Sequence, residues 1–166
     1  MFKSSKNNGM TVVETLVYIA ILAFLFFMVV ETLTTIARTY RATAVTRSLS
    51  SSGMTALDRI SREIRDAASV DEVQSIFNIN PGKLVLIKGA TTTEFYVEGG
   101  LIRIRENGIS KGAITSDSST TTNLIFRLIT TPKSRAVKVE INLESGTSTS
   151  LRAANFYNTA VLRGSY

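Results

Sequence analysis

The sequence predicts an α+β fold, in which a long amino-terminal helix, its first half transmembrane, packs on a mainly antiparallel β-sheet. Three observations favour this fold class. A run of about 20 mostly apolar residues, 11–30, matches a hydrocarbon core of roughly 30 Å at ~1.5 Å per residue. A helical pattern then continues to about Ala68, and after Pro81-Gly82 the apolar residues recur with a period of two. We therefore expect one β-rich globular head over residues 69–166.

The apolar segment favours a membrane span over other interpretations. A secretory signal peptide usually has an apolar core of about 7–15 residues before a small-x-small cleavage site, and no clear site of that kind follows Glu31. A buried helix of a soluble domain is disfavoured because residues 24–28 leave no polar stripe. A simple signal anchor stays open on these grounds. We expect residues 10–30 to form the transmembrane half of the helix and residues 31–68 its exposed half.

Glu14 is the only charged residue between Lys6 and Glu31. A charged side chain at the centre of a membrane helix costs roughly 2.5–3.5 kcal/mol on insertion scales and less near the interface. An ionisable residue at the mouth of a membrane-length segment is therefore a candidate functional residue. The first turn of a helix favours negative charge, because the helix dipole is positive there.

The sequence Gly9-Met10-Thr11-Val12-Val13-Glu14, followed by the apolar run 15–23, resembles the amino terminus of type IV prepilins and type II secretion pseudopilins. The resemblance implies that a membrane prepilin peptidase cleaves after Gly9, leaving residues 1–9 as a leader. It also implies N-methylation of Met10, where the family most often has Phe. Glu14 would then meet the terminal amine of a neighbouring subunit during assembly. Glycine at the cut suits close approach by a peptidase, since it has no Cβ.

Two further passages resemble one branch of this family, the minor pilins and J-type minor pseudopilins. These are Ile60–Ala68 and Phe156–Arg163. The chain has no cysteine, so it cannot form the carboxy-terminal disulfide loop of many major pilins. This absence favours a minor component. Which machine the chain serves, a pilus, a secretion pseudopilus or a competence filament, stays open.

The exposed half of the helix has a predicted weak point at residues 48–53, where four serines and a glycine are poor helix formers. We expect a kink or break there. Beyond it, an apolar stripe is expected on one face, formed by Met54, Leu57, Ile60, Ile64 and Ala68. On the other face, Asp58–Arg62 and Arg62–Asp66 are spaced for i,i+4 ion pairs.

The head is predicted to contain strands separated by polar turns. The expected strands cover residues 83–88, 93–97, 101–105, 123–129, 137–143 and 151–162. Glu98-Gly99-Gly100 is typical of a hairpin turn, and Asn107-Gly108 marks another turn. Residues 116–123 are predicted to form a polar loop, and Glu144–Thr147 a turn.

Composition argues against an enzyme. Without cysteine or histidine, the chain lacks thiol nucleophiles, imidazole bases and the usual zinc ligand sets. Ser110–Lys111 and Lys133–Ser134 are adjacent pairs, but solvated loop residues are the favoured interpretation. Asp117 is the only carboxylate in its loop, whereas oxygen-only calcium sites usually need several. We expect no catalytic residues, no metal site and no cofactor.

The net charge of +6 leaves the class of partner open. The head carries six cationic residues that a DNA-binding competence pilin could use: Arg103, Arg105, Arg127, Lys133, Arg135 and Lys138. Such residues are also ordinary on exposed strands, so we do not expect nucleic acid as a partner. The resemblance implies prepilin peptidase, other pilin subunits and the bacterial inner membrane as partners, with the head outside the cytoplasm. The alternative is a plain single-pass, membrane-anchored binding domain.

Overall fold

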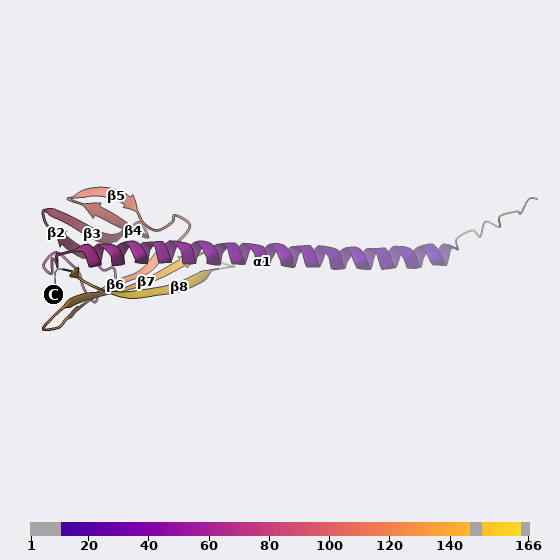
Figure 1. The fold of residues 1–166 in the computed structure, drawn as a ribbon. Helices are drawn as coiled ribbons and strands as arrows, with labels where there is room; N and C mark the ends of the chain where they lie inside the picture. Colours follow the sequence, from indigo (N-terminus) through magenta and orange to yellow (C-terminus); the bar gives the residue numbers. More distant parts are fainter. Residues whose placement is uncertain (1–10, 147–150, 164–166) are drawn as a thin grey trace, which may run out of the picture. The chain divides into compact units, whose positions relative to one another are not determined.

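The structure, a computed structural model, describes residues 11–146 and 151–163 (Figure 1). It contains one long helix, α1 (Val12–Asp66), followed by strands. The strands are β1 (Ser69–Val70), β2 (Leu84–Lys88), β3 (Thr91–Glu98), β4 (Leu101–Glu106), β5 (Ile109–Ala113), β6 (Thr120–Thr130), β7 (Arg135–Ser145) and β8 (Arg152–Val161). The chain divides into two units, Met1–Ala42 and Thr43–Tyr166, and α1 contributes to both. The predicted α+β class is therefore confirmed, with one long apolar helix and antiparallel sheets.

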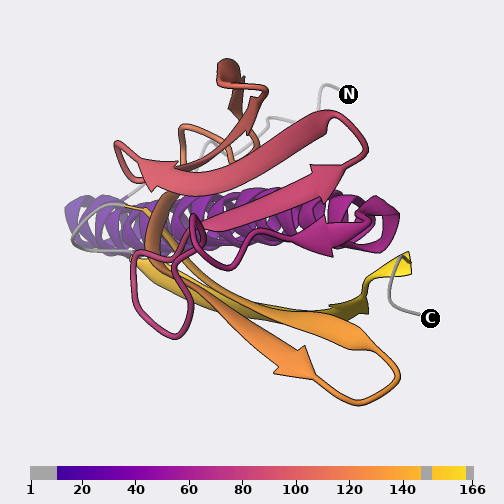
Figure 2. The ribbon, with the colours of Figure 1, turned by 90° about the vertical axis from the view of Figure 1, so that its left-hand side faces the viewer.

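The strands of the second unit form two antiparallel sheets, whereas one sheet was predicted. One has the order β1-β2-β3-β4-β5 and the other the order β6-β7-β8. Figure 2 shows them as two separate groups of strands beside the carboxyl-terminal part of α1. Their inner faces meet the helix in one core, whose largest buried side chains include Phe95, Phe126 and Ile60.

The segment 78–82 explains why the two groups of strands stay separate. Asn80 places its side chain against the edge of β6, where its Oδ1 accepts from Leu124 N at 2.9 Å and its Nδ2 donates to Thr122 O at 3.2 Å. The backbone of Gly82 also donates to Leu124 O at 2.7 Å. Since these groups use the free edge of β6, no further strand pairs there. A strand pattern based on hydrophobicity does not predict this contact, because the residue that covers the edge has a polar side chain.

The hairpin turns lie where the sequence places them. Between β3 and β4, Gly99 and Gly100 have φ values of 62° and 77°. Between β4 and β5, Asn107 and Gly108 have φ values of 49° and 80°. Positive φ at both central positions is the requirement of the type I′ two-residue hairpin turn, which Gly and Asn meet at least cost. Strand β5 itself was not predicted, because Ile109–Ala113 contains a lysine and a glycine and is mostly exposed.

The predicted break at 48–53 is wrong, because α1 continues through these residues. The small side chains here are buried contacts rather than helix ends: Leu49, Ser52 and Gly53 are all enclosed. The core-facing stripe is therefore displaced from the predicted one. Ile60 and Ile64 are buried as expected, and Leu57 is partly buried, but Met54 is 65% exposed. Ala68 lies beyond the end of α1 and is exposed, while Ala67 is buried.

Ion pairs cover the outer face of this helical segment. The predicted pair of Arg62 with Asp58 is present at 2.7 Å. Asp66 instead contacts Lys88 of β2 at 3.4 Å, so the second predicted pair is replaced by a contact from helix to sheet. The predicted polar loop is also shorter, because β6 begins at Thr120.

Candidate membrane anchor and assembly site

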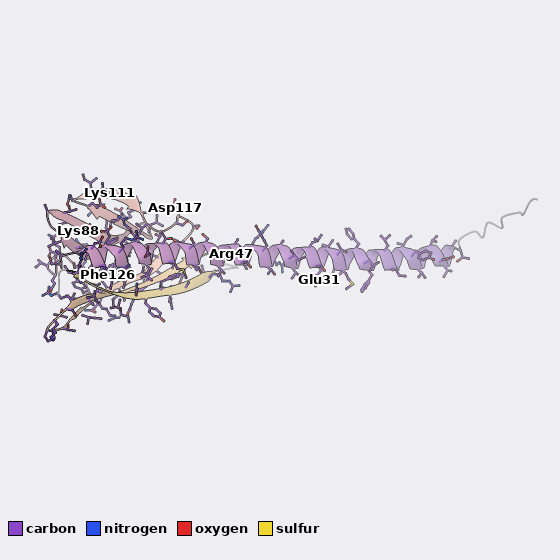
Figure 3. All side chains as sticks on the ribbon, viewed as in Figure 1. Glu31, Arg47, Lys88, Lys111, Asp117 and Phe126 are labelled. Atoms are coloured by element: carbon purple, nitrogen blue, oxygen red, sulfur yellow. The ribbon has the colours of Figure 1, made fainter. Side chains whose placement is uncertain are left out.

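The first part of α1 is apolar and exposed all round. An 18-residue window reaches a mean hydropathy of 2.5, and none of it is buried in the structure. Figure 3 shows side chains standing out both above and below the helix along this stretch. Leu22, Phe26 and Phe27 are each 67–69% exposed. The helix is long and apolar enough to cross a membrane, and a surface of this kind requires lipid or protein to cover it.

Glu14 lies in the first turn of α1, as expected, and its backbone is capped by Thr11. Thr11 Oγ1 accepts a hydrogen bond from Glu14 N at 3.3 Å. Thr-x-x-Glu is the sequence of a capping box, in which the threonine satisfies an amide that has no helical carbonyl partner. Thr15 N then donates to Thr11 O at 3.2 Å and starts the regular helical ladder. The residues preceding Glu14 thus fix the helix start.

The Glu14 carboxylate accepts a hydrogen bond from Tyr18, which the sequence analysis missed. Tyr18 Oη donates to Glu14 Oε1 at 3.2 Å. The two residues are four apart and hence on one face of the helix, and this spacing was the signal that could have identified the pair. A phenol is a neutral donor, so the bond orients the carboxylate and leaves its charge in place.

Glu14 has no ion-pair partner among residues 11–146 and 151–163. The predicted cleavage site, Gly9 and Met10, lies outside the described residues. The described part of the site therefore consists of three polar side chains, Thr11, Glu14 and Tyr18, at the start of an apolar helix. Chemically, it can accept a cation at the exposed carboxylate.

Threonines further along α1 bind back to their own helix. Thr32 and Thr34 donate to carbonyls four residues earlier, each at 2.8 Å. Thr35 and Thr39 do the same at 3.0 Å. A hydroxyl that donates within the helix needs no acceptor from water, so these four threonines are satisfied by α1 itself.

A hydroxyl network joins the helix to the turn before β6. Ser52 Oγ accepts from Ser116 N at 2.9 Å and lies 3.3 Å from Ser119 Oγ. Ser48 Oγ lies 3.1 Å from Ser118 Oγ, and Ser145 of β7 donates to the carbonyl of Ser118. The serines at 48 and 52, predicted to weaken the helix, thus bind the turn that links the two sheets.

The basic residues of the head are mostly paired with carboxylates. Arg103 contacts Glu98 at 3.1 Å, Arg127 contacts Glu140 at 3.1 Å, Arg135 contacts Glu72 at 3.0 Å, and Lys138 contacts Glu140 at 2.8 Å. Arg105 contacts Glu94 at 3.0 Å and lies over the ring of Tyr96, 4.5 Å from its centroid.

These ion pairs shift the pKa values of two residues. The hydrogen bond to Glu94 raises the pKa of Arg105 above its ordinary value. Hydrogen bonds from Arg127 and then Lys138 lower the pKa of Glu140. Both shifts favour the charged form, of the Arg105 guanidinium and of the Glu140 carboxylate.

The residues considered for catalysis occupy structural positions. Ser134 closes the β6–β7 turn, where its N donates to Thr131 Oγ1 at 3.0 Å. Lys111 contacts Glu106 at 3.6 Å. Within the described ranges, no group of three or more His, Cys, Asp or Glu side chains is placed to hold a metal ion, and Asp117 is exposed in its turn.

Comparisons of the chain with protein-family models, with curated proteins and with solved structures found no match. The functional interpretation therefore rests on the residues themselves and on the geometry of the anchor.

Proposed function

We propose that this chain is a non-enzymatic structural subunit, a minor pilin or pseudopilin, of a type IV pilus-like or type II secretion filament. In this proposal, prepilin peptidase removes residues 1–9 and Met10 becomes the methylated amino terminus. The helix inserts in the bacterial inner membrane with the head outside the cytoplasm. Assembly then transfers the helix from lipid to contacts with other subunits.

The observation that carries the proposal is the uncompensated Glu14 at the start of the apolar helix. The carboxylate has only the Tyr18 hydroxyl as a side-chain partner among the described residues. In a low-dielectric environment an unpaired carboxylate is costly, and an opposite charge from another molecule removes much of that cost. A terminal amine at Met10 of a neighbouring subunit would supply this charge at a defined depth and thus set the register.

The exposed apolar face of α1 would supply the affinity between subunits. Fully burying a large apolar side chain gives roughly 1.5–3 kcal/mol relative to water, although contacts that replace lipid gain packing energy only. Many residues of the helix are available, including Leu16, Leu22 and Phe27, each more than 60% exposed. Charge pairing and helix packing would act together, the first giving register and the second strength.

The deciding experiment is mass spectrometry of the amino terminus of the chain expressed with a prepilin peptidase. The proposal predicts a mature chain that begins at N-methylated Met10. A Gly9→Leu chain is the matched control and should retain residues 1–9. An unprocessed wild-type chain in the presence of active peptidase would contradict the proposal and favour the plain membrane-anchored binding domain, which needs no cleavage.

The second candidate is a DNA-binding competence pilin. Five of the six cationic residues considered for DNA binding contact carboxylates, which reduces the positive potential that DNA phosphates require. Lys133, in the β6–β7 turn, has no ion-pair partner within residues 11–146 and 151–163. One free cation is a weak basis for phosphate binding, so we favour the structural role.

A further inference from the structure

The outer face of the three-stranded sheet carries a row of three asparagines. Asn123 of β6 is paired in register with Asn142 of β7, and Asn142 with Asn155 of β8. Directly opposed residues on neighbouring strands have Cβ atoms about 4.5–5.5 Å apart. The row therefore presents three carboxamides side by side, each able to donate and to accept hydrogen bonds.

These asparagines line a groove of about 250 Å³. At its floor, Asn142 Oδ1 is buried and has no hydrogen-bond partner among the described residues. A buried acceptor without a partner is uncommon, because it loses the hydrogen bonds of water and gains none. The acceptor lies in the middle of the row but has almost no accessible surface, so a donor in the groove reaches it once the Asn142 carboxamide turns toward the groove.

An aromatic ring flanks the row. Tyr157 lines the same groove, is paired in register with Glu140, and is 74% exposed. An exposed aromatic side chain offers a flat apolar surface with a polar hydroxyl at its tip. The groove thus combines a flat apolar wall with carboxamide donors and acceptors.

The charged residues beside the groove form ion pairs with one another. Glu140 accepts from Arg127 Nε at 3.1 Å, and Lys138 contacts the same carboxylate oxygen at 2.8 Å. Arg127 and Lys138 share this single carboxylate, so the three residues together carry only one net positive charge. One net charge is a weak basis for binding nucleic acid, which requires several cations.

From this combination we infer that the asparagine groove binds one unit of a neutral, hydroxyl-rich glycan. Each sugar hydroxyl both donates and accepts, which matches the carboxamide row and supplies the donor that Asn142 Oδ1 lacks. The apolar C–H face of the sugar ring would pack on Tyr157. A groove of this volume is smaller than the roughly 300–1,000 Å³ of drug-sized ligand sites, which suits a single ring of a longer chain. The inference does not depend on filament assembly.

Calorimetric titration of the full chain in lipid nanodiscs tests the inference. The probes are a hexamer of β-1,4-linked glucose, a hexamer of β-1,4-linked N-acetylglucosamine and, as the anionic arm, a thymidine dodecamer. We expect at least one neutral hexamer to bind with micromolar to millimolar affinity. Asn142→Ala and Tyr157→Ala should each weaken binding by about tenfold or more. Thr159→Ala, on the same face of β8 but outside the groove, should leave binding unchanged.

Asn142→Ala and Tyr157→Ala suit the test because neither removes a known stabilising contact of the folded state. Asn142→Ala deletes an acceptor that has no partner, so its melting temperature should match or exceed that of the wild type. Tyr157→Ala changes a mostly exposed side chain. Three results would overturn the inference: no binding of either neutral hexamer, equal binding by all three variants, or preferential, salt-sensitive binding of the thymidine dodecamer.

Discussion

The ring of Phe156 lies directly against the backbone of Gly53, so closely that a Cβ built on Gly53 would stand 2.2 Å from Phe156 Cε2. This contact brings strand β8 against α1 at the point where the helix has its smallest residue. The glycine serves close packing here, and its position in the middle of a helix is explained by the neighbour rather than by the helix itself.

Gly53→Ala should destabilise the second unit despite improving helix propensity. Alanine is favoured over glycine in an exposed helix by about 1 kcal/mol, whereas overpacking a core costs about 1–3 kcal/mol. We expect a net loss of up to about 2 kcal/mol, measured by urea unfolding of the full chain in detergent micelles. The double variant with Phe156→Leu should recover part of the loss. Equal or greater stability of Gly53→Ala alone would mean that the ring moves aside without cost.

Ser52→Ala should loosen the turn before β6. The substitution leaves Ser116 N without its acceptor at a part-buried position, where water can partly replace the bond, so the cost is about 1 kcal/mol. Hydrogen–deuterium exchange should show faster exchange over residues 114–119. Ser51→Ala, at the exposed neighbouring position, is the matched control and should exchange as the wild type does. The same exchange rates in both variants would show that Ser52 does not hold the turn.

Glu14→Ala should spare membrane insertion and abolish most incorporation into filaments. Removal of the carboxylate makes the helix start more apolar, so insertion is not impaired, but the charge partner for a neighbour is lost. Membrane fractionation and quantification of sheared filaments measure the two properties separately. Glu31→Ala removes the next acidic residue along the helix, just beyond the apolar run, and should assemble normally. Wild-type incorporation of the Glu14→Ala chain would contradict the assembly role.

Tyr18→Phe should reduce filament incorporation to a level between those of the wild type and Glu14→Ala. The variant keeps the ring but removes the hydroxyl that donates to Glu14 Oε1, so the carboxylate keeps its charge and loses its orientation. Tyr40→Phe makes the same chemical change on the same helix and should have no effect. If the two variants assemble equally well, Tyr18 does not position Glu14.

Glu140 should make stability depend on pH. Its pKa is lowered in the folded state by Arg127 and Lys138, so the unfolded chain takes up a proton at higher pH than the folded chain does. The stabilisation is therefore complete at neutral pH and is lost as the pH falls through the lowered pKa. Glu140→Gln should cost about 0.2–1 kcal/mol at about pH 7, and this difference should shrink at about pH 3.

Urea unfolding at the two pH values measures the Glu140 effect. Glu144→Gln, on the same face of β7, is the control for the loss of a carboxylate. A difference between the wild type and Glu140→Gln that stays constant over this range would contradict the assignment of the pH dependence to this residue.

The sequence predicted the elements that follow from simple periodicity. The alternation around Val139 and Ile141 identified β7, and the glycines at 99–100 identified the β3–β4 turn. Contacts between residues distant in sequence could not be predicted from these local patterns. The helix through 48–53 is stabilised by Phe156 and by Ser116, which are distant in sequence, so local helix propensity alone predicted a break.

Only part of the candidate site could be predicted from the sequence, for similar reasons. Glu14 is conspicuous because it is a lone charge beside an apolar run, and its first-turn position follows from the pattern. Tyr18 is one of several aromatic residues in that run, and only the i,i+4 spacing distinguishes it. The asparagine groove depends on the register of three strands, and register cannot be deduced from the composition of each strand.

The threonines that bind back to α1 make four hydroxyls of its polar stretch nearly independent of their surroundings. Moving an unbonded hydroxyl from water into a nonpolar medium costs about 1–3 kcal/mol, but Thr32, Thr34, Thr35 and Thr39 each take a carbonyl of their own helix as partner. The free energy of these four hydroxyls therefore changes little among water, lipid and a protein interface, whereas the charged Arg38 in the same stretch still favours water. A helix that has to pass between such media can do so without gaining or losing partners at these four positions.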